Sequence, residues 1–296
     1  MNVTEDRINL WAKAISETEE TKCQNAISQI TEVIREHFGN DVTIIPQGSH
    51  RNRTNIRADS DVDIAIVHDS YHFPNISSLS ESDKQLHNKY SVNASYTFEQ
   101  FKIDIHNILK NKFGLLSVER KNKCIRIKGN TYRINADVVP AYGYTRYRSF
   151  NDIEAKGVAF KTDNTSERVA SFPHHHYNNG VKKNDSTNKA YKAVVRVLKN
   201  TRNELVEKGL YPADSISSFF IECLVWNVPD LYFRNTTYRE DARAVALKIW
   251  SDMKDPEKSN LYAEVCDLHW LFRGSTSRTP KQAEEFMLMA WNYLEA

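Results

Sequence analysis

The chain has 296 residues, enough to bury a large core as one bilobed unit or as two closely packed domains. Its 40 basic and 38 acidic residues give a net charge of +2, so no overall field attracts it to nucleic acid. No segment approaches the roughly 18 consecutive apolar residues of a membrane span, and the polar N-terminus lacks the apolar stretch of a signal peptide. We therefore expect a cytoplasmic protein with no membrane partner.

Cysteines, glycines and prolines are all scattered along the chain. The cysteines form no C-x-x-C pair, and we expect them to be buried, reduced thiols: Cys23, Cys124, Cys223 and Cys266. Nine glycines and eight prolines occur without a low-complexity linker or an internal repeat, so we expect two lobes that pack together rather than two tethered domains.

The N-terminal part of the chain predicts two helices and a strand. Thr4 is expected to cap a short helix, with Glu5 and Asp6 in its first turn complementing the helix dipole. A strand is expected over residues 42–45. A longer helix, which should end before Gly39, is expected between the short helix and this strand. Its apolar residues recur at helical spacing: Cys23, Ala26, Ile27, Ile30, Val33 and Ile34.

The pair Gly48-Ser49 follows this strand and a proline, and so lies where a strand ends and a turn or helix begins. Backbone N–H groups exposed at such a junction, beside a small hydroxyl group, favour a site that binds phosphate. We include Gln47, directly before the pair, among the candidate nucleotide-binding residues.

Asp61 and Asp63 begin a stretch rich in β-branched residues that predicts a buried strand. Side chains two residues apart on a strand point to the same face, separated by about 6.6 Å at about 3.3 Å per residue. An isolated D-x-D pair is most often a solvated strand end. With Gly48-Ser49 upstream and an apolar strand behind, we instead expect the two carboxylates to bind a pair of divalent cations.

The stretch GSHRNRTNIRADSDVDIAIV resembles the signature of polymerase-β-type nucleotidyltransferases, and more narrowly the TNxRxxSDVD form of bacterial cGAS/DncV-like nucleotidyltransferases, the CD-NTases. Those enzymes make cyclic oligonucleotide second messengers in anti-phage defence. Many of them have glycine just before the threonine, where this chain has Arg53. The resemblance implies two Mg²⁺ ions, with Mn²⁺ as a substitute, held by Asp61, Asp63 and a third carboxylate.

The middle of the chain supplies that third carboxylate. Residues 70–94 are polar and predict an irregular surface loop, and a helix should follow over residues 98–113. A hairpin is then expected, with a first strand at residues 124–128, a tight turn at Gly129-Asn130 and a return strand at residues 131–139. On the resemblance, Asp137 in the return strand completes the metal site.

Three adjacent histidines open the sequence HHHYNNGVKKN, but adjacent side chains diverge and no cysteine lies near them, so we do not expect a zinc site there. From its tyrosine onward the sequence resembles CD-NTases of the clade called CdnE, in which a polar side chain influences pyrimidine use. We therefore assign base reading to Asn179, whose amide can both donate and accept, with Asn178 as the substitute. The alternative is that Asn179-Gly180 is simply a turn.

A basic stripe follows on a predicted helix, next to an apolar face. Such a stripe is usually solvated; beside a phosphate-handling site it favours a triphosphate clamp. Its members are Lys189, Lys192, Arg196 and Lys199. By resemblance, Lys192 and Ser218 contact the donor triphosphate together with Ser49, with Ser217 as the fallback for Ser218.

The rest of the chain predicts helices over residues 215–228 and 242–250, and a final helix opened by a capping box at Thr279-Pro280-Lys281-Gln282. We therefore predict an α+β fold. Residues 1–165 should form the nucleotidyltransferase core, a mixed sheet with helices, and residues 166–296 a helical lobe that closes the nucleotide cleft.

The resemblance, which covers nearly the whole chain, implies an enzyme that joins two or three NTPs into a cyclic oligonucleotide. We expect a pyrimidine-containing product such as cyclic UMP-AMP or cyclic di-UMP, with UTP and ATP as favoured substrates. It implies a downstream effector protein activated by that product; we expect a monomer and no direct nucleic-acid activator. The alternatives are a nucleotidyltransferase that modifies RNA or a small molecule, and an inactive nucleotide-binding module.

Overall fold

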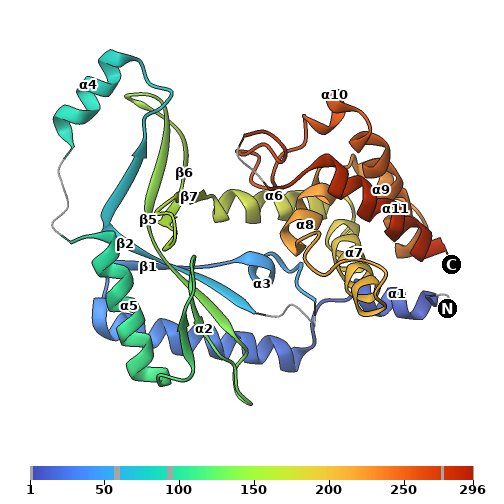
Figure 1. Cartoon of the computed structure of the whole chain (residues 1–296), viewed down its shortest axis with the longest axis horizontal. Coiled ribbons are helices and arrows are strands. Elements are labelled where there is room, and N and C mark those ends of the chain that lie inside the picture. The colour runs from blue at the N-terminus through green and yellow to red at the C-terminus, as the bar shows by residue number, and fades with distance from the viewer. Residues whose placement is uncertain (1–2, 57–60, 92–95, 275–276, 296) are drawn as a thin grey trace. The chain divides into compact units, whose positions relative to one another are not determined.

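The computed structural model describes residues 3–56, 61–91, 96–274 and 277–295 (Figure 1). The chain divides into two compact units. The sheet unit comprises Ser16–Arg51 and Ser60–Pro173. The helical unit comprises Met1–Ile15, Asn52–Asp59 and His174–Ala296, so two segments from the N-terminal part of the chain belong with the C-terminal helices. The division into functional domains at residue 165 stays a prediction.

The described strands of the sheet unit form one mixed sheet. Its order is β1-β2-β5-β4-β3, with β6 paired to β5 and β7 paired to β6. β2 and β5 run parallel, and the other pairs are antiparallel, which confirms the predicted mixed sheet. The bounds are β1 Val42–Gln47, β2 Val62–Asn75, β3 Val118–Arg120, β4 Ile125–Ile127, β5 Ala136–Ser149, β6 Asp152–Lys161 and β7 Arg168–Ser171.

Two long helices, α2 and α5, pack on this sheet (Figure 1). α2 begins with a capping box in which Ser16 and Glu19 bond each other's backbone N–H groups, and its apolar face is buried. Burying each large aliphatic side chain of that face contributes about 1.5–3 kcal/mol. The helices of the unit are α2 Glu17–Phe38, α3 Gly48–Asn52, α4 Glu81–Tyr90 and α5 Phe98–Phe113.

The prediction of an irregular loop after residue 70 is wrong over most of its length. β2 continues to Asn75, because after a bulge its last residues pair with β5. α4 follows, capped by the side chain of Ser80. None of the residues of α4 is buried, so its sequence lacks the apolar period by which a helix is recognised.

The predicted hairpin exists, but its return strand begins at Ala136 rather than at residue 131. Asn130 accounts for the difference. Its side-chain oxygen accepts hydrogen bonds from the backbone N–H groups of Tyr132 (2.9 Å) and Arg133 (2.9 Å), which occupies donors that a strand would need. The chain therefore completes its turn before the return strand begins to pair with β4.

The helical unit packs around α7, whose buried residues include Tyr191, Val194, Val195 and Leu198. α1 contacts α7 and α9, which explains why the N-terminal segment belongs to this unit. Thr279 and Gln282 bond reciprocally at the start of α11, as the capping box predicted. The bounds are α1 Glu5–Ala12, α6 Pro173–Ser186, α7 Ala190–Glu207, α8 Ser218–Trp226, η2 Asp230–Phe233, α9 Tyr238–Met253, α10 Pro256–Ser259 and α11 Pro280–Glu295.

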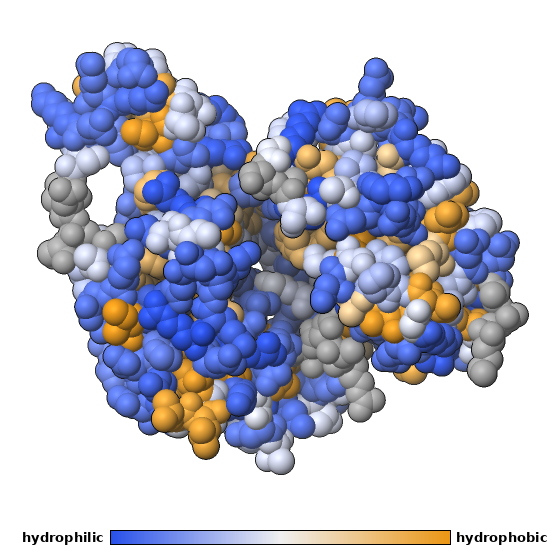
Figure 2. Space-filling model, in the orientation of Figure 1, coloured by the Kyte–Doolittle hydropathy of each residue, from blue (hydrophilic) through white to orange (hydrophobic). Residues whose placement is uncertain are grey.

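The face of the molecule seen in Figure 2 is mostly hydrophilic, with apolar side chains gathered only in small patches. Within the described part of the chain, no helix combines the length and the apolar character that crossing a membrane requires.

Candidate active site

Four polar residues form one row across neighbouring strands of the sheet. Gln47 at the end of β1 pairs with Asp63 of β2, Asp63 pairs with Asp137 of β5, and Asp137 pairs with Arg126 of β4. Asp61 directly precedes β2, two residues before Asp63. The structure therefore brings together the three carboxylates that the sequence indicated, although Asp61 lies just before β2 and not within the strand as expected.

The carboxylates repel one another. Burial raises the pKa of Asp63 to about 7, and the charges of Asp137 and Asp61 add to this effect. Burial also raises the pKa of Asp137, although the positive charge of Arg126 works in the opposite direction. Buried like charges at this spacing are unfavourable unless a proton or a cation compensates them.

The hydrogen bonds of the group leave an opening for a cation. Both oxygens of Asp61 are occupied, one by Arg126 and the other by Asn135 Nδ2 at 2.9 Å. Asp137 Oδ1 is buried and has no hydrogen-bond partner among the described residues. A buried carboxylate oxygen without a partner is costly, and such oxygens are the ligands that Mg²⁺ prefers. The residues present therefore fit a divalent cation.

Gly48 lies against Asp63 at the junction of β1 and α3. A Cβ atom at position 48 would lie 1.8 Å from Asp63 Oδ2, and the φ of Gly48 is +70°, which disfavours any other residue. Ser49 follows in α3 and is half-buried. The pair thus adjoins the carboxylates; its role in binding phosphate stays a prediction.

Arg126 and Asn135 contact Asp61 but were not among the residues chosen from the sequence. Arg126 comes from the strand whose apolar and basic residues alternate, and Asn135 precedes β5. The sequence signal that could have identified Asn135 is its position two residues before Asp137, on the same face of the expected strand. The register that sets Arg126 opposite Asp137 has no local signature.

In the helical unit, Glu222 holds Thr54 through a buried network. Its carboxylate accepts hydrogen bonds from Thr54 Oγ1 (2.6 Å) and His176 Nε2 (2.8 Å), and Lys199 Nζ lies 3.4 Å away. Lys199 Nζ also donates to the carbonyl oxygen of Thr54 at 2.9 Å. Burial by itself raises the pKa of Glu222, but Lys199, His176 and Thr54 outweigh it and lower that pKa to about 2.

Arg53, where many relatives have glycine by resemblance, adopts a φ of +54°. Its carbonyl oxygen accepts a hydrogen bond from Arg196 Nη1 at 2.6 Å, and Arg196 Nε donates to the carbonyl oxygen of Ala12 at 2.9 Å. The departure at Arg53 therefore keeps a backbone conformation that glycine adopts without strain.

The basic stripe is buried over most of its length. The alternative that it is a solvated surface is therefore wrong for three of its four members, Lys192, Arg196 and Lys199. Arg196 and Lys199 bind backbone carbonyl groups, and exposed Lys189 pairs with Asp185. Lys192 forms no ion pair with any residue that the structure describes. Burial lowers the pKa of Lys192, and the nearby charges of Arg196 and Arg53 lower it further, while Glu222 raises it.

Ser218 begins α8, where its hydroxyl accepts a hydrogen bond from Arg202 Nη1 at 3.0 Å. Ser217 instead caps the helix, accepting from the backbone N–H of Phe220 at 3.1 Å. Both serines line a pocket together with Arg202 and Asp214. Ser217 thus serves as the cap of α8, and the assignment of Ser218 to the donor triphosphate stays a prediction.

Asn179 lies within α6, so the alternative that Asn179-Gly180 forms a turn is wrong. Its Nδ2 donates to the carbonyl oxygen of Val265 at 2.9 Å, whereas its Oδ1 has no partner among the described residues. Asn179 is half-buried and Asn178 is exposed. His176, one turn before Asn179, binds Glu222.

Residues 178–295 match the family described as the cGAS/DncV-like nucleotidyltransferase C-terminal helical domain. Over its whole length the chain is similar to characterised proteins. It is 44% identical to a cyclic dipurine nucleotide synthase of Elizabethkingia meningoseptica, covering 99% of each chain. It is 36% identical to the cyclic dipyrimidine nucleotide synthase CdnE of Legionella pneumophila, covering 98% of each chain.

A solved structure agrees with these sequence similarities. The structure of Elizabethkingia meningoseptica CdnE cyclic dinucleotide synthase with GTP and Apcpp superimposes with a TM-score of 0.82 at 40% identity, covering all of both chains. The match extends over both units of the chain.

Proposed function

Since this chain belongs to the cGAS/DncV-like nucleotidyltransferases, we propose that it joins two NTPs into a cyclic dinucleotide that acts as a second messenger in anti-phage defence. The observation that carries this proposal is the row of carboxylates on adjacent strands, with a buried oxygen of Asp137 that has no partner in the described structure. Similarity along 99% of the chain to a cyclic nucleotide synthase supports the same activity.

Asp61, Asp63 and Asp137 would hold the metal, and Mg²⁺ is the cation that we propose, with Mn²⁺ as a substitute. When bound, this cation pair supplies positive charge to the phosphates and lowers the pKa of the attacking hydroxyl. Gln47 and the backbone at Gly48-Ser49 orient the donor triphosphate. Pyrophosphate leaves as the hydroxyl of the second nucleotide attacks the α-phosphorus, and a second such transfer closes the ring.

Lys192 and Ser218 are the further residues that we propose to contact the donor triphosphate. The ammonium group of Lys192 has no carboxylate partner among the described residues, unlike Lys183, which pairs with Asp230, and Lys189, which pairs with Asp185. A phosphate oxygen would supply the negative charge that a buried cation needs.

We propose uracil as one of the bases, read by Asn179. Because the Nδ2 of Asn179 is committed to the carbonyl of Val265, its Oδ1 remains as an acceptor for the N3–H group of uracil. Cytosine has no hydrogen at N3 and could reach this acceptor only through its N4 amino group. The dipyrimidine activity of the Legionella relative agrees with this choice.

A purine product is the second candidate, and one observation favours it. The relative with 44% identity is a dipurine synthase. In addition, the N1–H group of guanine could donate to the same Oδ1 of Asn179. Identification of the bases in the product therefore distinguishes the two candidates.

The test is to incubate the purified protein with all four NTPs and Mg²⁺, treat the mixture with phosphatase, and identify resistant products by mass spectrometry. A cyclic dinucleotide made by wild type and not by Asp63→Asn would support the proposed function. Nucleotide transfer to RNA or to a small molecule in place of a cyclic product would support the alternative nucleotidyltransferases. Nucleotide binding without any transfer would indicate an inactive binding module.

We also propose that the product activates a separate effector protein and that the enzyme works as a monomer in the cytoplasm. The conformation of a cyclic dinucleotide differs from that of its linear precursor, so an effector can distinguish signal from substrate. Light scattering at working concentration would measure the oligomeric state.

A further inference from the structure

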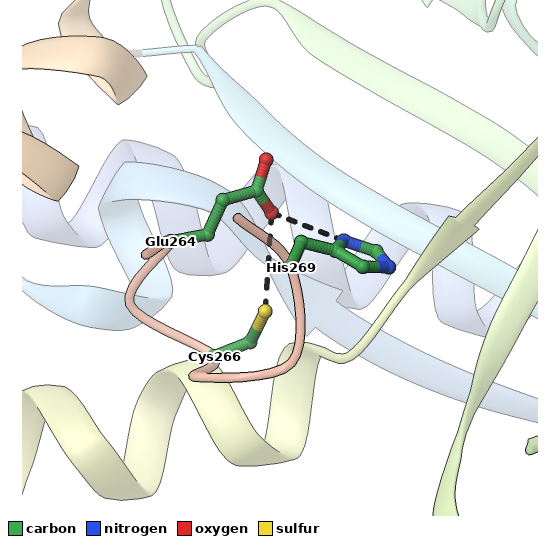
Figure 3. Close-up of side chains that lie close together, drawn as sticks. All are labelled: Glu264, Cys266 and His269. Atoms are coloured by element: carbon green, nitrogen blue, oxygen red, sulfur yellow. Dashed lines mark hydrogen bonds and ion pairs between the residues drawn. The ribbon is translucent and has the colours of Figure 1, made fainter. Parts of the chain in front are cut away.

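The segment between α10 and α11 carries three metal-ligating residues in the pattern E-x-C-x-x-H: Glu264, Cys266 and His269. Figure 3 shows their side chains turned toward one another from a single loop. The loop closes on itself, since the N–H of Glu264 donates to the carbonyl of His269 at 2.8 Å and the N–H of Asp267 donates to the carbonyl of Glu264 at 2.8 Å. The backbone thus holds the three side chains in place.

Two of the three distances between the donor atoms are close to those of ligands around one tetrahedral cation. Cys266 Sγ lies 3.8 Å from Glu264 Oε2, and His269 Nδ1 lies 3.3 Å from the same oxygen. Bonds of about 2.3 Å to sulfur and about 2.0 Å to oxygen or nitrogen would separate tetrahedral ligands by about 3.5 Å and 3.3 Å respectively. A Zn²⁺ ion would require shifts of a few tenths of an ångström at the two distances from Glu264 Oε2, and the three ligand atoms all lie within 4.8 Å of one another.

The same distances are long for hydrogen bonds alone. A charge-assisted bond between a ring nitrogen and a carboxylate is usually about 2.7–2.9 Å long. The other oxygen of Glu264 is held at 2.7 Å by Arg278 Nη2, which leaves Oε2 directed at the thiol and the imidazole. An outer partner of this kind orients a ligand carboxylate.

We propose that Glu264, Cys266 and His269 bind a Zn²⁺ ion, with water as the fourth ligand. Sulfur, nitrogen and oxygen donors together suit Zn²⁺ better than Mg²⁺, which takes oxygen ligands only. The carboxylates of the sheet belong to the other unit, where the thiol of Cys124 lies beside Asp137, so the test must distinguish Cys266 from Cys124.

The site has a consequence for Asn179. Val265 lies between two of the ligands, and its carbonyl accepts the hydrogen bond from Asn179 Nδ2 at 2.9 Å. A metal that fixes Glu264 and Cys266 also fixes this carbonyl, and with it the orientation of the Asn179 amide. This consequence, unlike the metal site itself, rests on the proposed function of Asn179 in reading the base.

The test uses the full-length protein, stripped with a chelator and then titrated with Co²⁺ in a large excess of Mg²⁺, which occupies the carboxylates of the sheet. Wild type is expected to bind one Co²⁺ per chain with a thiolate-to-metal charge-transfer band in the near ultraviolet, and Zn²⁺ should abolish the band. Cys266→Ser should lose it, while Cys124→Ser, which removes the thiol beside Asp137, should keep it.

Two further variants guard against misfolding of Cys266→Ser. His269→Ala changes a partly exposed ring, and Arg278→Gln changes an outer partner; the latter should weaken Co²⁺ binding by roughly 10- to 100-fold. Circular dichroism checks that each variant is folded. Absence of the band in wild type, or an equal band in His269→Ala, would overturn the site.

A second readout separates the metal site from the proposed function, because Co²⁺ binding is measured without nucleotide. If the enzyme makes a cyclic product, chelation of Zn²⁺ should change the ratio of incorporated bases in wild type. The ratio in Asn179→Ser should not respond. A ratio that chelation leaves unchanged in wild type would overturn the link to Asn179.

Discussion

Gly48 and Asp63 lie so close together that a single methyl group would not fit between them. A Cβ atom on Gly48 would overlap Asp63 Oδ2, at 1.8 Å, and would lie 2.7 Å from its Cγ. The turn that follows β1 and the carboxylate of β2 therefore occupy their positions only together. Whatever binds the backbone at Gly48 must also meet the charge of Asp63.

We predict that Gly48→Ala removes nucleotide-joining activity by at least about 100-fold, because a displacement of Asp63 by one ångström has an effect of that size on a well-oriented site. Turnover of NTPs measures the loss. Gly39→Ala is the control, since Gly39 also has a positive φ, +54°, but its Cβ would meet nothing within 4 Å. Equal losses in the two variants would show that backbone strain, and not contact with Asp63, is responsible.

We predict that Asp61→Asn, Asp63→Asn and Asp137→Asn each abolish activity, because an amide cannot replace the charge that binds a cation. Asp63→Asn should also raise the free energy of unfolding of the metal-free protein, by about 1 kcal/mol or more. The reason is that burial and two neighbouring carboxylates raise the pKa of Asp63 to about 7, so its ionised form is destabilising. Denaturant titration measures this gain in the free energy of unfolding. If one of the three variants retains substantial turnover, the substituted aspartate does not have its proposed role.

We predict that Lys192→Ala raises the KM for NTP with a smaller effect on kcat, because the ammonium group binds the triphosphate in ground and transition states alike. Lys208→Ala is the matched control, since this exposed lysine at the C-terminal end of α7 pairs with Glu204 and is not part of the basic stripe. Unchanged kinetics in Lys192→Ala would move the clamp to Lys183, Lys189 or Arg196, each of which would first have to leave its present partner.

The pKa of Glu222 predicts a pH dependence of stability. Its folded-state pKa of about 2 lies below the ordinary value of 4.5, so its ionisation stabilises the folded protein by about 3 kcal/mol above that value. This contribution is lost as pH falls from about 4.5 toward 2. The groups that face Glu222 are Lys199, His176 and Thr54.

We therefore expect Glu222→Gln to lower the free energy of unfolding by about 3 kcal/mol at pH 7, because it leaves the ammonium group of Lys199 buried without a counter-charge. The difference from wild type should shrink as the pH falls below about 4.5. Denaturant titrations of both proteins at several pH values measure it. A difference independent of pH would mean that the carboxylate contributes by shape and not by charge.

We predict that wild type incorporates labelled UTP and that Asn179→Ser changes the relative use of UTP, CTP, ATP and GTP. The shorter serine cannot keep the bond to Val265 and also present an acceptor at the position of Asn179 Oδ1. Asn178→Ser tests the substitute, and it should leave base choice unchanged because Asn178 is exposed. Exclusive use of purines by wild type, or unchanged base choice in Asn179→Ser, would refute this assignment.

Several elements could be predicted because their signals are local. α2 and α5 bury one face each, and the apolar period of that face is written in the sequence. α4 escaped prediction because it buries nothing, and the extension of β2 escaped because its last residues gain their partners only from β5. The turn of the hairpin ends later than the sequence predicts, because the side chain of Asn130 accepts hydrogen bonds from two backbone N–H groups.

The sequence alone determined the candidate carboxylates at Asp61 and Asp63, because the D-x-D pair and the apolar strand behind it are local signals, although Asp61 lies just before the strand. It also pointed to Gly48, since the end of a strand is a local event. Only the tertiary structure decided that Asp137 adjoins Asp63, that Arg126 reaches Asp61, and that Lys199 is buried against Glu222. These relationships depend on strand register and helix packing, which arise from contacts between segments far apart in the chain, and no short window of sequence contains both partners.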